Sequence, residues 1–144
     1  MKRWLASFAL LSAAFTSSAA AQTPGLEALA GRWTLTTGPH PSSGCVITGN
    51  ATATRSGATL NIDLNVVQAC ADGIQYRARE ACVGRLERGA LNVSCRLVSA
   101  VEGYVADQFS LRVVGAGELI GRLDDGDQWD VPCTWRRAQG ALVS

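Results

Sequence analysis

The stretch that decides the fold is Leu60–Val66, with the sequence LNIDLNV. Leucine, isoleucine and valine alternate there with asparagine and aspartate, so one face of the segment is apolar and the other is polar. This period of two is typical of a β-strand with one buried face. An amphipathic helix would need apolar residues every three or four positions, and outside 25–30 no segment shows that spacing.

Seven further runs of strand character surround this one, and turns that contain glycine separate several of them. The eight runs cover 31–37, 45–54, 58–68, 74–86, 90–101, 106–114, 118–123 and 128–137. Their spacing is typical of a sandwich or a barrel, and we predict an all-β, eight-stranded antiparallel up-and-down barrel. Pro132 cannot donate to a β-ladder, so we expect either a bulge or partial closure at the last strand.

The hairpin turns predict the register of the strands. A turn at Ser56–Gly57 pairs Leu60 with Ala53, so that apolar side chains meet on one face. A two-residue loop at Arg88–Gly89 makes Cys82 and Cys95 direct cross-strand partners, at a separation that suits a disulfide.

Five cysteines follow the first 21 residues, and in an exported protein they indicate disulfides. The hairpin register predicts the pair Cys82–Cys95. Cys45 begins the second run and Cys70 ends the third, so adjacent antiparallel strands bring these two together as the second pair. Cys133 is left as a buried, inert thiol, because its pairing with Cys45 or Cys70 would require loops to cross.

The N-terminus has the pattern of an export signal. Lys2 and Arg3 precede an apolar stretch at 5–15, and Ala19–Ala21 supplies a small-residue cleavage site. The apolar stretch is too short to span a bilayer, and no later segment is apolar enough. We therefore expect a signal peptide at 1–21, a single barrel domain at 22–144, and a periplasmic or secreted, monomeric protein.

Charge and composition exclude several classes of function. The chain has 13 basic and 12 acidic residues without a basic run, which argues against nucleic acid as a partner. His40 is the single histidine, and neither a Cys-x-x-Cys motif nor a Gly-x-Ser-x-Gly elbow occurs, so we expect no metal site, no cofactor and no enzymatic activity.

Side-chain parity predicts which residues face the barrel interior. The candidates for ligand binding are Tyr76, Glu80, Phe109 and Trp129. An unpaired carboxylate is costly inside a barrel, so Glu80 either anchors a polar ligand group, forms a salt bridge with an arginine, or is returned to solvent by a bulge near Arg79, which we favour. Inward glycines at 49, 84 and 121 either leave a cavity or make room for tryptophans.

Gly31-x-Trp33 on the first run, together with Trp135, Arg136 and Arg137 on the last, resembles the signature of the calycin superfamily. The resemblance implies that the tryptophan plugs the closed end of the barrel and that Arg136 or Arg137 packs across it. The segment Leu26–Leu35, followed by Cys45, is similar to the opening of bacterial secreted metalloprotease inhibitors. That similarity implies an N-terminal tail that enters a protease active site.

Three functions compete on this basis. The favoured one is non-enzymatic binding of a small, largely apolar ligand at a barrel mouth framed by loops at 38–44, 70–73, 102–104 and 124–127. The second is inhibition of a periplasmic or secreted protease through the tail at 22–30. The third is an envelope-associated structural domain without a small ligand.

Overall fold

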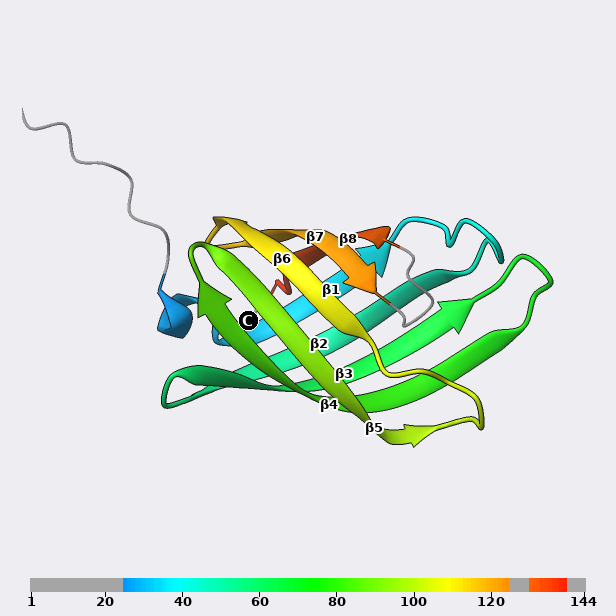
Figure 1. Cartoon of the computed structure of the whole chain (residues 1–144), viewed down its shortest axis with the longest axis horizontal. Coiled ribbons are helices and arrows are strands. Elements are labelled where there is room, and N and C mark those ends of the chain that lie inside the picture. Colours follow the sequence, from blue (N-terminus) through cyan, green and yellow to red (C-terminus); the bar gives the residue numbers. More distant parts are fainter. Residues whose placement is uncertain (1–24, 125–129, 140–144) are drawn as a thin grey trace, which may run out of the picture.

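The computed structural model describes residues 25–124 and 130–139. They form a closed barrel of eight antiparallel strands, in which each strand pairs with the next along the chain and the last pairs with the first (Figure 1). A short 3-10 helix, η1 (Leu26–Leu29), precedes the strands, which are β1 (Gly31–Thr37), β2 (Val46–Ser56), β3 (Thr59–Ala69), β4 (Gln75–Glu87), β5 (Ala90–Ala100), β6 (Gln108–Gly115), β7 (Glu118–Asp124) and β8 (Asp130–Arg137). The predicted fold class is confirmed. Among the described residues, no helix is long and apolar enough to cross a membrane.

Apolar side chains fill the interior of the barrel. The buried core combines leucines from β3, β5, β6 and β7 with Trp33 and Trp135. The inward glycines do not leave empty space, because a Cβ at Gly84 would touch Leu91 and Ile62, and a Cβ at Gly49 would press on the backbone of β3. The glycines therefore allow neighbouring strands and side chains to approach closely.

Gly121 gives the sharpest test of this packing. A Cβ at this position would collide with the carbonyl oxygen of Ser110 and lie 2.8 Å from the Cα atom of Leu111 on the neighbouring strand. Gly121→Ala should therefore lower the free energy of unfolding by about 1–3 kcal/mol, measured by urea denaturation. Gly117→Ala is the matched control, since a Cβ there would meet nothing within 4 Å. Equal stability of the two variants would contradict this account.

The predicted register of the first long hairpin is wrong by two residues. Leu60 pairs with Arg55 rather than Ala53, because Ser56 pairs with Thr59 and the turn consists of Gly57 and Ala58. Gly57 has a φ of 59°, which glycine adopts without steric cost. A shift of two residues keeps every side chain on its face, so the predicted apolar face is still the buried one.

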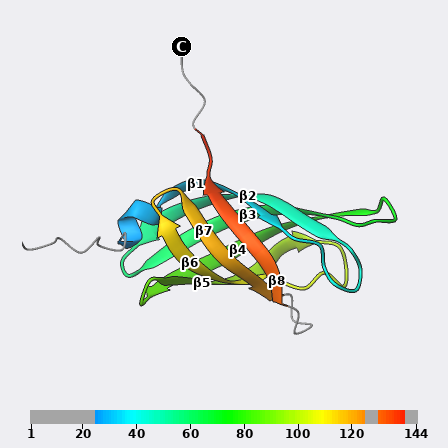
Figure 2. The same ribbon diagram turned by 90° about the horizontal axis from the view of Figure 1, so that it is seen from above.

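Pro132 causes neither of the expected distortions. Five consecutive residue pairs join β1 to β8, from Trp33 with Arg137 to Thr37 with Cys133, with no register shift (Figure 2). The carbonyl oxygen of Pro132 accepts a hydrogen bond from the Gly38 amide, 2.8 Å away. Because the N and C=O of one strand residue point to the same side, the missing N–H of Pro132 faces the point where β1 has already ended.

The closed end of the barrel is built on Trp33 and Arg137. The Trp33 side chain is 2% exposed, and its indole N–H donates to the carbonyl oxygen of Leu29 at 2.9 Å. The Arg137 guanidinium lies 4.5 Å from the centroid of the Trp33 ring and donates to the Ala30 carbonyl at 2.9 Å. Gly31 has a φ of 126°, and a Cβ there would lie 2.7 Å from Arg137 Nη1. Arg137 is thus the arginine that packs across the tryptophan.

The neighbouring signature residues have other roles. Arg136 points outward and forms an exposed ion pair with Glu118, at 3.3 Å. Trp135 lies in the core, where its ring meets Phe109 edge to face at a centroid distance of 5.2 Å. Because η1 and the paired ends of β1 and β8 lie together, the loops that follow β1, β3 and β5 lie at the opposite, open end (Figure 1).

Candidate functional site

A cavity of about 300 Å³ opens at the end of the barrel opposite Trp33. We call it the open-end cavity. Its wall combines side chains of β2, β3 and β4 with the segment 101–107 that joins β5 to β6, and its lining includes Ile47, Gln68, Tyr76, Val101, Tyr104 and Asp107. Its volume is at the lower end of the range of small-molecule sites. Larger hollows along the outer face of the sheet are lined mainly by outward-facing residues, such as Arg85 and Asn92, and are open to solvent.

The cavity exists because the barrel wall parts between β5 and β6. These two strands pair from Ala90 with Arg112 to Ser94 with Gln108, and no further. The remainder of β5 continues beside β4 alone, so the segment 101–107 must cross the mouth to reach β6. Gln108 bridges the point of divergence, since its side-chain amide donates to the Cys95 carbonyl at 3.3 Å.

Two acidic side chains lie buried beside the cavity. Glu80 is 0% exposed and Asp107 is 1% exposed, and the backbone amide of Asp107 donates to Glu80 Oε1 at 3.0 Å. We call these residues the carboxyl pair. Asp107 lines the open-end cavity, and the Tyr104 hydroxyl donates to its Oδ2 at 3.4 Å. The pair thus joins the core of the barrel to its mouth.

Burial raises the pKa of the Glu80 carboxyl above its ordinary value, because the charged form loses its hydration. Hydrogen bonds from the backbone and side chain of Asp107 oppose this shift only in part. With both carboxyl groups ionised, no hydrogen-bond donor among the described residues reaches Glu80 Oε2. Two carboxyl groups in contact can share one proton, and a raised pKa is the expected result.

The expectation that a bulge returns Glu80 to solvent is wrong, although a bulge does occur there. Arg79 pairs with Ser99 and Glu80 with Leu97, so the extra residue is Val98 on β5. Because the extra residue belongs to the partner strand, the alternation of β4 is undisturbed and Glu80 stays inside. Arg79 points outward, where it forms an ion pair with Asp63 at 3.1 Å.

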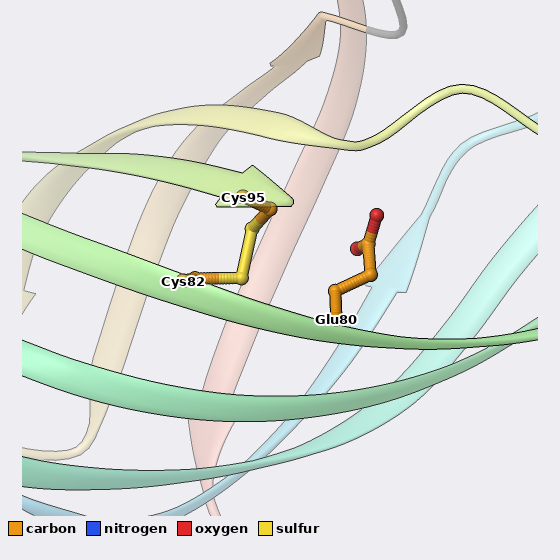
Figure 3. A group of neighbouring side chains, drawn as sticks. All are labelled: Glu80, Cys82 and Cys95. Atoms are coloured by element: carbon orange, nitrogen blue, oxygen red, sulfur yellow. A yellow bond between two sulfur atoms is a disulfide. The ribbon is translucent and has the colours of Figure 1, made fainter. Parts of the chain in front are cut away.

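Glu80 also lies beside the disulfide Cys82–Cys95, and both project from the same side of the sheet (Figure 3). The carboxylate and the two sulfur atoms lie within 4.8 Å of one another, a spacing that suits metal ligands. Both sulfurs are bonded to each other, however, and a metal ion requires thiolates. In the oxidised protein this group is therefore a packing arrangement rather than a metal centre.

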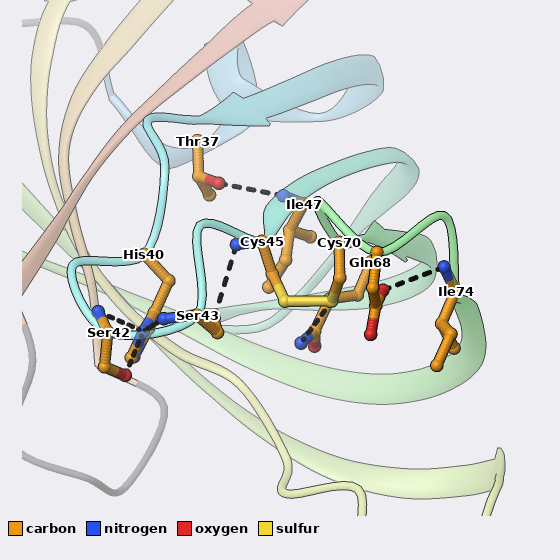
Figure 4. The surroundings of a disulfide bond; sticks show 10 residues. Thr37, His40, Ser42, Ser43, Cys45, Ile47, Gln68, Cys70 and Ile74 are labelled. Atoms are coloured by element: carbon orange, nitrogen blue, oxygen red, sulfur yellow. Dashed lines mark hydrogen bonds between the residues drawn. A yellow bond between two sulfur atoms is a disulfide. The ribbon is translucent and has the colours of Figure 1, made fainter.

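The second disulfide, Cys45–Cys70, ties together two loops of the open end (Figure 4). It joins the start of β2 to the end of β3, as the strand order predicted. In the loop between β1 and β2, the Ser42 hydroxyl lies 3.0 Å from His40 Nδ1, and the backbone amide of Ser42 donates to this nitrogen. These contacts shape the loop at 38–44, which flanks the mouth.

Cys133 is buried and free, as predicted from the pairing of the other four cysteines. Burial raises the pKa of its thiol to about 12, the nearby Trp135 side chain lowers it slightly, and the charge of Asp107 adds to the rise. A thiol with this pKa is almost entirely protonated near neutral pH, so it is a poor nucleophile.

The sequence-predicted ligand residues separate in the structure. Tyr76 lines the open-end cavity, and Glu80 lies behind Asp107. Phe109 belongs to the core against Trp135 instead, and Trp129 lies outside the described residues. Sequence reasoning placed the loop at 102–104 at the mouth without naming Tyr104 as a ligand residue, and it missed Asp107. Parity with Phe109 and Leu111 would have pointed Asp107 inward.

No protein-family model matches this chain. No curated protein matches it either. Among solved structures, it is similar to a redesigned β-barrel, mFAP1, bound to DFHBI, with a TM-score of 0.57, 17% identity, and coverage of 77% of this chain and 96% of that one. The redesigned barrel mFAP0, bound to DFHBI, gives a TM-score of 0.55 at 18% identity, covering 76% and 99%. A further fluorescence-activating β-barrel, designed de novo, gives 0.55 at 13%, covering 78% and 95%. At these identities the likeness concerns the fold alone, which is a small closed β-barrel of eight antiparallel strands.

Proposed function

We propose that this chain is an exported, non-enzymatic binding protein that holds a small, largely apolar molecule in the open-end cavity. The observation that carries the proposal is the cavity itself, since the rest of the barrel interior is filled by side chains. Its wall combines aliphatic and aromatic side chains with the polar groups of Gln68, Glu102 and Asp107, so it offers both apolar contact and polar groups that can orient a ligand. The designed barrels bound to DFHBI show that a barrel of this size has room for a small molecule.

The disulfides support the exported part of the proposal. Both fit an oxidising environment outside the cytoplasm, which agrees with the export signal expected at 1–21. The arrangement of Trp33 beneath Arg137 supports kinship with the calycins, in which such a pair closes the barrel.

The inhibitor function gains less support. Its active segment would include 26–30, yet Leu29 is buried in the core and the carbonyls of Ala28 and Ala30 accept hydrogen bonds from Arg137. Because 26–30 packs on the closed end of the barrel, the structure gives the tail mechanism less support than the cavity gives to ligand binding. A catalytic function also gains no support from Cys133, whose thiol is protonated near neutral pH.

Uptake of a neutral fluorescent probe, N-phenyl-1-naphthylamine, tests the proposal. We expect saturable fluorescence enhancement with one probe bound per chain. Tyr76→Ala should weaken binding about two- to tenfold, because an aromatic contact contributes about 0.5–1.5 kcal/mol and 1.4 kcal/mol is a factor of ten.

Two further variants locate the site. Val105 lines the cavity and is 54% exposed, so Val105→Trp should block the mouth without disturbing the core. Val83 lies on the outer face of β4, and Val83→Ala should bind the probe like the wild type. The proposed site would be overturned if the folded wild-type protein takes up no probe. It would also be overturned if all three variants bind the probe equally well.

A further inference from the structure

The open-end cavity is acidic where its lining carries charge. Asp107 lies at its inner wall and Glu102 at its rim, and none of the described residues that line it is basic. The arginines of β4 nearest to Glu80 do not change this balance, because side chains alternate along the strand. Arg77 lines a trough on the outer face, and Arg79 is paired with Asp63 outside the barrel.

Glu80 presents an acceptor that the described surroundings leave without a donor. Its Oε1 receives the Asp107 amide at 3.0 Å, whereas Oε2 is fully buried and receives none. An ionised carboxylate only accepts hydrogen bonds, and an acceptor left unsatisfied in the interior is costly. Because Asp107 lines the cavity and Glu80 does not, N–H donors of a ligand would reach the carboxyl pair through Asp107, whereas a ligand with only acceptors would be repelled there.

The rest of the wall suits a cation attached to an apolar body. Tyr76 and Tyr104 contribute aromatic rings, and the faces of such rings attract ammonium groups. Val101 and Val105 offer aliphatic contact near the mouth. A volume of about 300 Å³ is enough for a body of one or two rings.

We propose that the open-end cavity recognises a primary amine in its protonated form, with the ammonium group on Asp107 and Glu80 behind it, and with a one- or two-ring apolar body between the tyrosines. This inference rests on the proposed function, and it assigns to that function a chemical class of ligand. The ammonium group brings N–H donors and a positive charge to Asp107, the buried acidic side chain that lines the cavity.

Binding of such a ligand is coupled to release of a proton. Burial raises the pKa of the Glu80 carboxyl, so this group keeps its proton to a higher pH than a surface carboxyl would. An ammonium group that replaces this proton leaves the charge of the site unchanged. Affinity should therefore rise with pH until the amine itself loses its charge. Among the described residues, the other titratable groups that line the cavity are Tyr76, Glu102 and Tyr104, and the Cys133 thiol of β8 interacts electrostatically with Asp107.

A matched pair of ligands tests the inference. We would measure the binding of 2-(1-naphthyl)ethylamine and of its neutral counterpart 2-(1-naphthyl)ethanol to the wild-type protein by isothermal titration calorimetry at about pH 7.5. We expect the amine to bind at least about tenfold more tightly. Titration in two buffers of different ionisation enthalpy should show proton release with the amine and none with the alcohol.

Variants assign the preference to the carboxyl pair. Asp107→Asn should reduce the preference for the amine to about threefold or less while the alcohol binds as before. Glu87→Gln, which removes an exposed carboxyl at the opposite end of β4, should keep the preference. If Asp107→Asn fails to fold, Glu80→Gln serves as the second variant. The amide has the size of the carboxyl group but no proton to release, so binding of the amine should no longer be accompanied by proton release.

The outcomes separate the two proposals. If the alcohol binds as tightly as the amine, the binding function stands and the amine assignment is overturned. The same holds if Asp107→Asn and Glu80→Gln both keep the preference. If neither ligand binds to the folded wild-type protein and N-phenyl-1-naphthylamine is not taken up, the binding function itself fails.

Discussion

Trp33→Ala should lower the free energy of unfolding by about 3–5 kcal/mol, as expected for removal of a buried aromatic side chain. The ring is 2% exposed, its N–H is bonded to Leu29, and Arg137 lies across its face. Its removal would open a void beneath η1 and deprive Arg137 of its aromatic partner. Urea denaturation followed by circular dichroism measures the change.

Thr34→Ala is the matched control for this prediction. Thr34 is the next residue on β1, but its side chain points outward and its hydroxyl makes a weak contact with the Arg136 carbonyl, at 3.4 Å. We expect a change within about 0.5 kcal/mol, as for most surface substitutions. If Trp33→Ala costs as little as Thr34→Ala, the closed end does not stabilise the barrel in the way described above.

Removal of the Cys45–Cys70 disulfide should cost about 3–4 kcal/mol, because the bond closes a loop of 25 residues and restricts the unfolded chain. The Cys82–Cys95 bond closes a shorter loop of 13 residues, so its removal should cost about 3 kcal/mol. The Cys45→Ala/Cys70→Ala and Cys82→Ala/Cys95→Ala double variants, compared by urea denaturation, test both values.

Cys133→Ala is the control for the disulfide variants, since it removes a thiol without opening a loop. Peptide mapping without reduction should yield the two predicted linkages, and Cys133 should react with iodoacetamide only after denaturation. A linkage between Cys133 and any other cysteine would contradict the pairing, and so would a wild-type stability that does not change on reduction.

The parts of the fold that could be predicted from the sequence depend on interactions between residues close together along the chain. The turn at Arg88–Gly89 places Cys82 opposite Cys95, and the structure has this register. The alternation in Leu60–Val66 predicts the buried face of β3 correctly. Local sequence signals are less decisive where two neighbouring positions could both form the turn. The turn was predicted at Ser56–Gly57 but lies at Gly57–Ala58, and the predicted register was therefore wrong by two residues.

The candidate site was harder to predict because it depends on the point where two strands separate. Parity placed Tyr76 and Glu80 inside, and both face inward. Parity also placed Phe109 inside, and it is inside, but its ring packs against Trp135 in the core and does not line the cavity. The loop at 102–104 was predicted to frame the mouth, and its residues line the cavity, but no residue pattern marks that β5 and β6 stop pairing at Ser94 and Gln108. The bulge at Val98 likewise arises from the pairing of two strands, so the sequence of β4 alone could not show which strand carries the extra residue.

The seam between β1 and β8 also determines how the chain can reach its native state. In the described barrel, every other strand pairing joins consecutive segments, and hairpins of this kind form within about 1–10 μs. The seam instead joins residues such as Thr34 and Arg136, which are 102 positions apart. The entropic cost of long-range closure is therefore concentrated in one late event. Consider a circular permutant in which the end of β8 is linked to the start of η1 and the chain begins at Gly57. The pairing of β1 with β8 would then be a local hairpin, and the long-range closure would join β2 to β3.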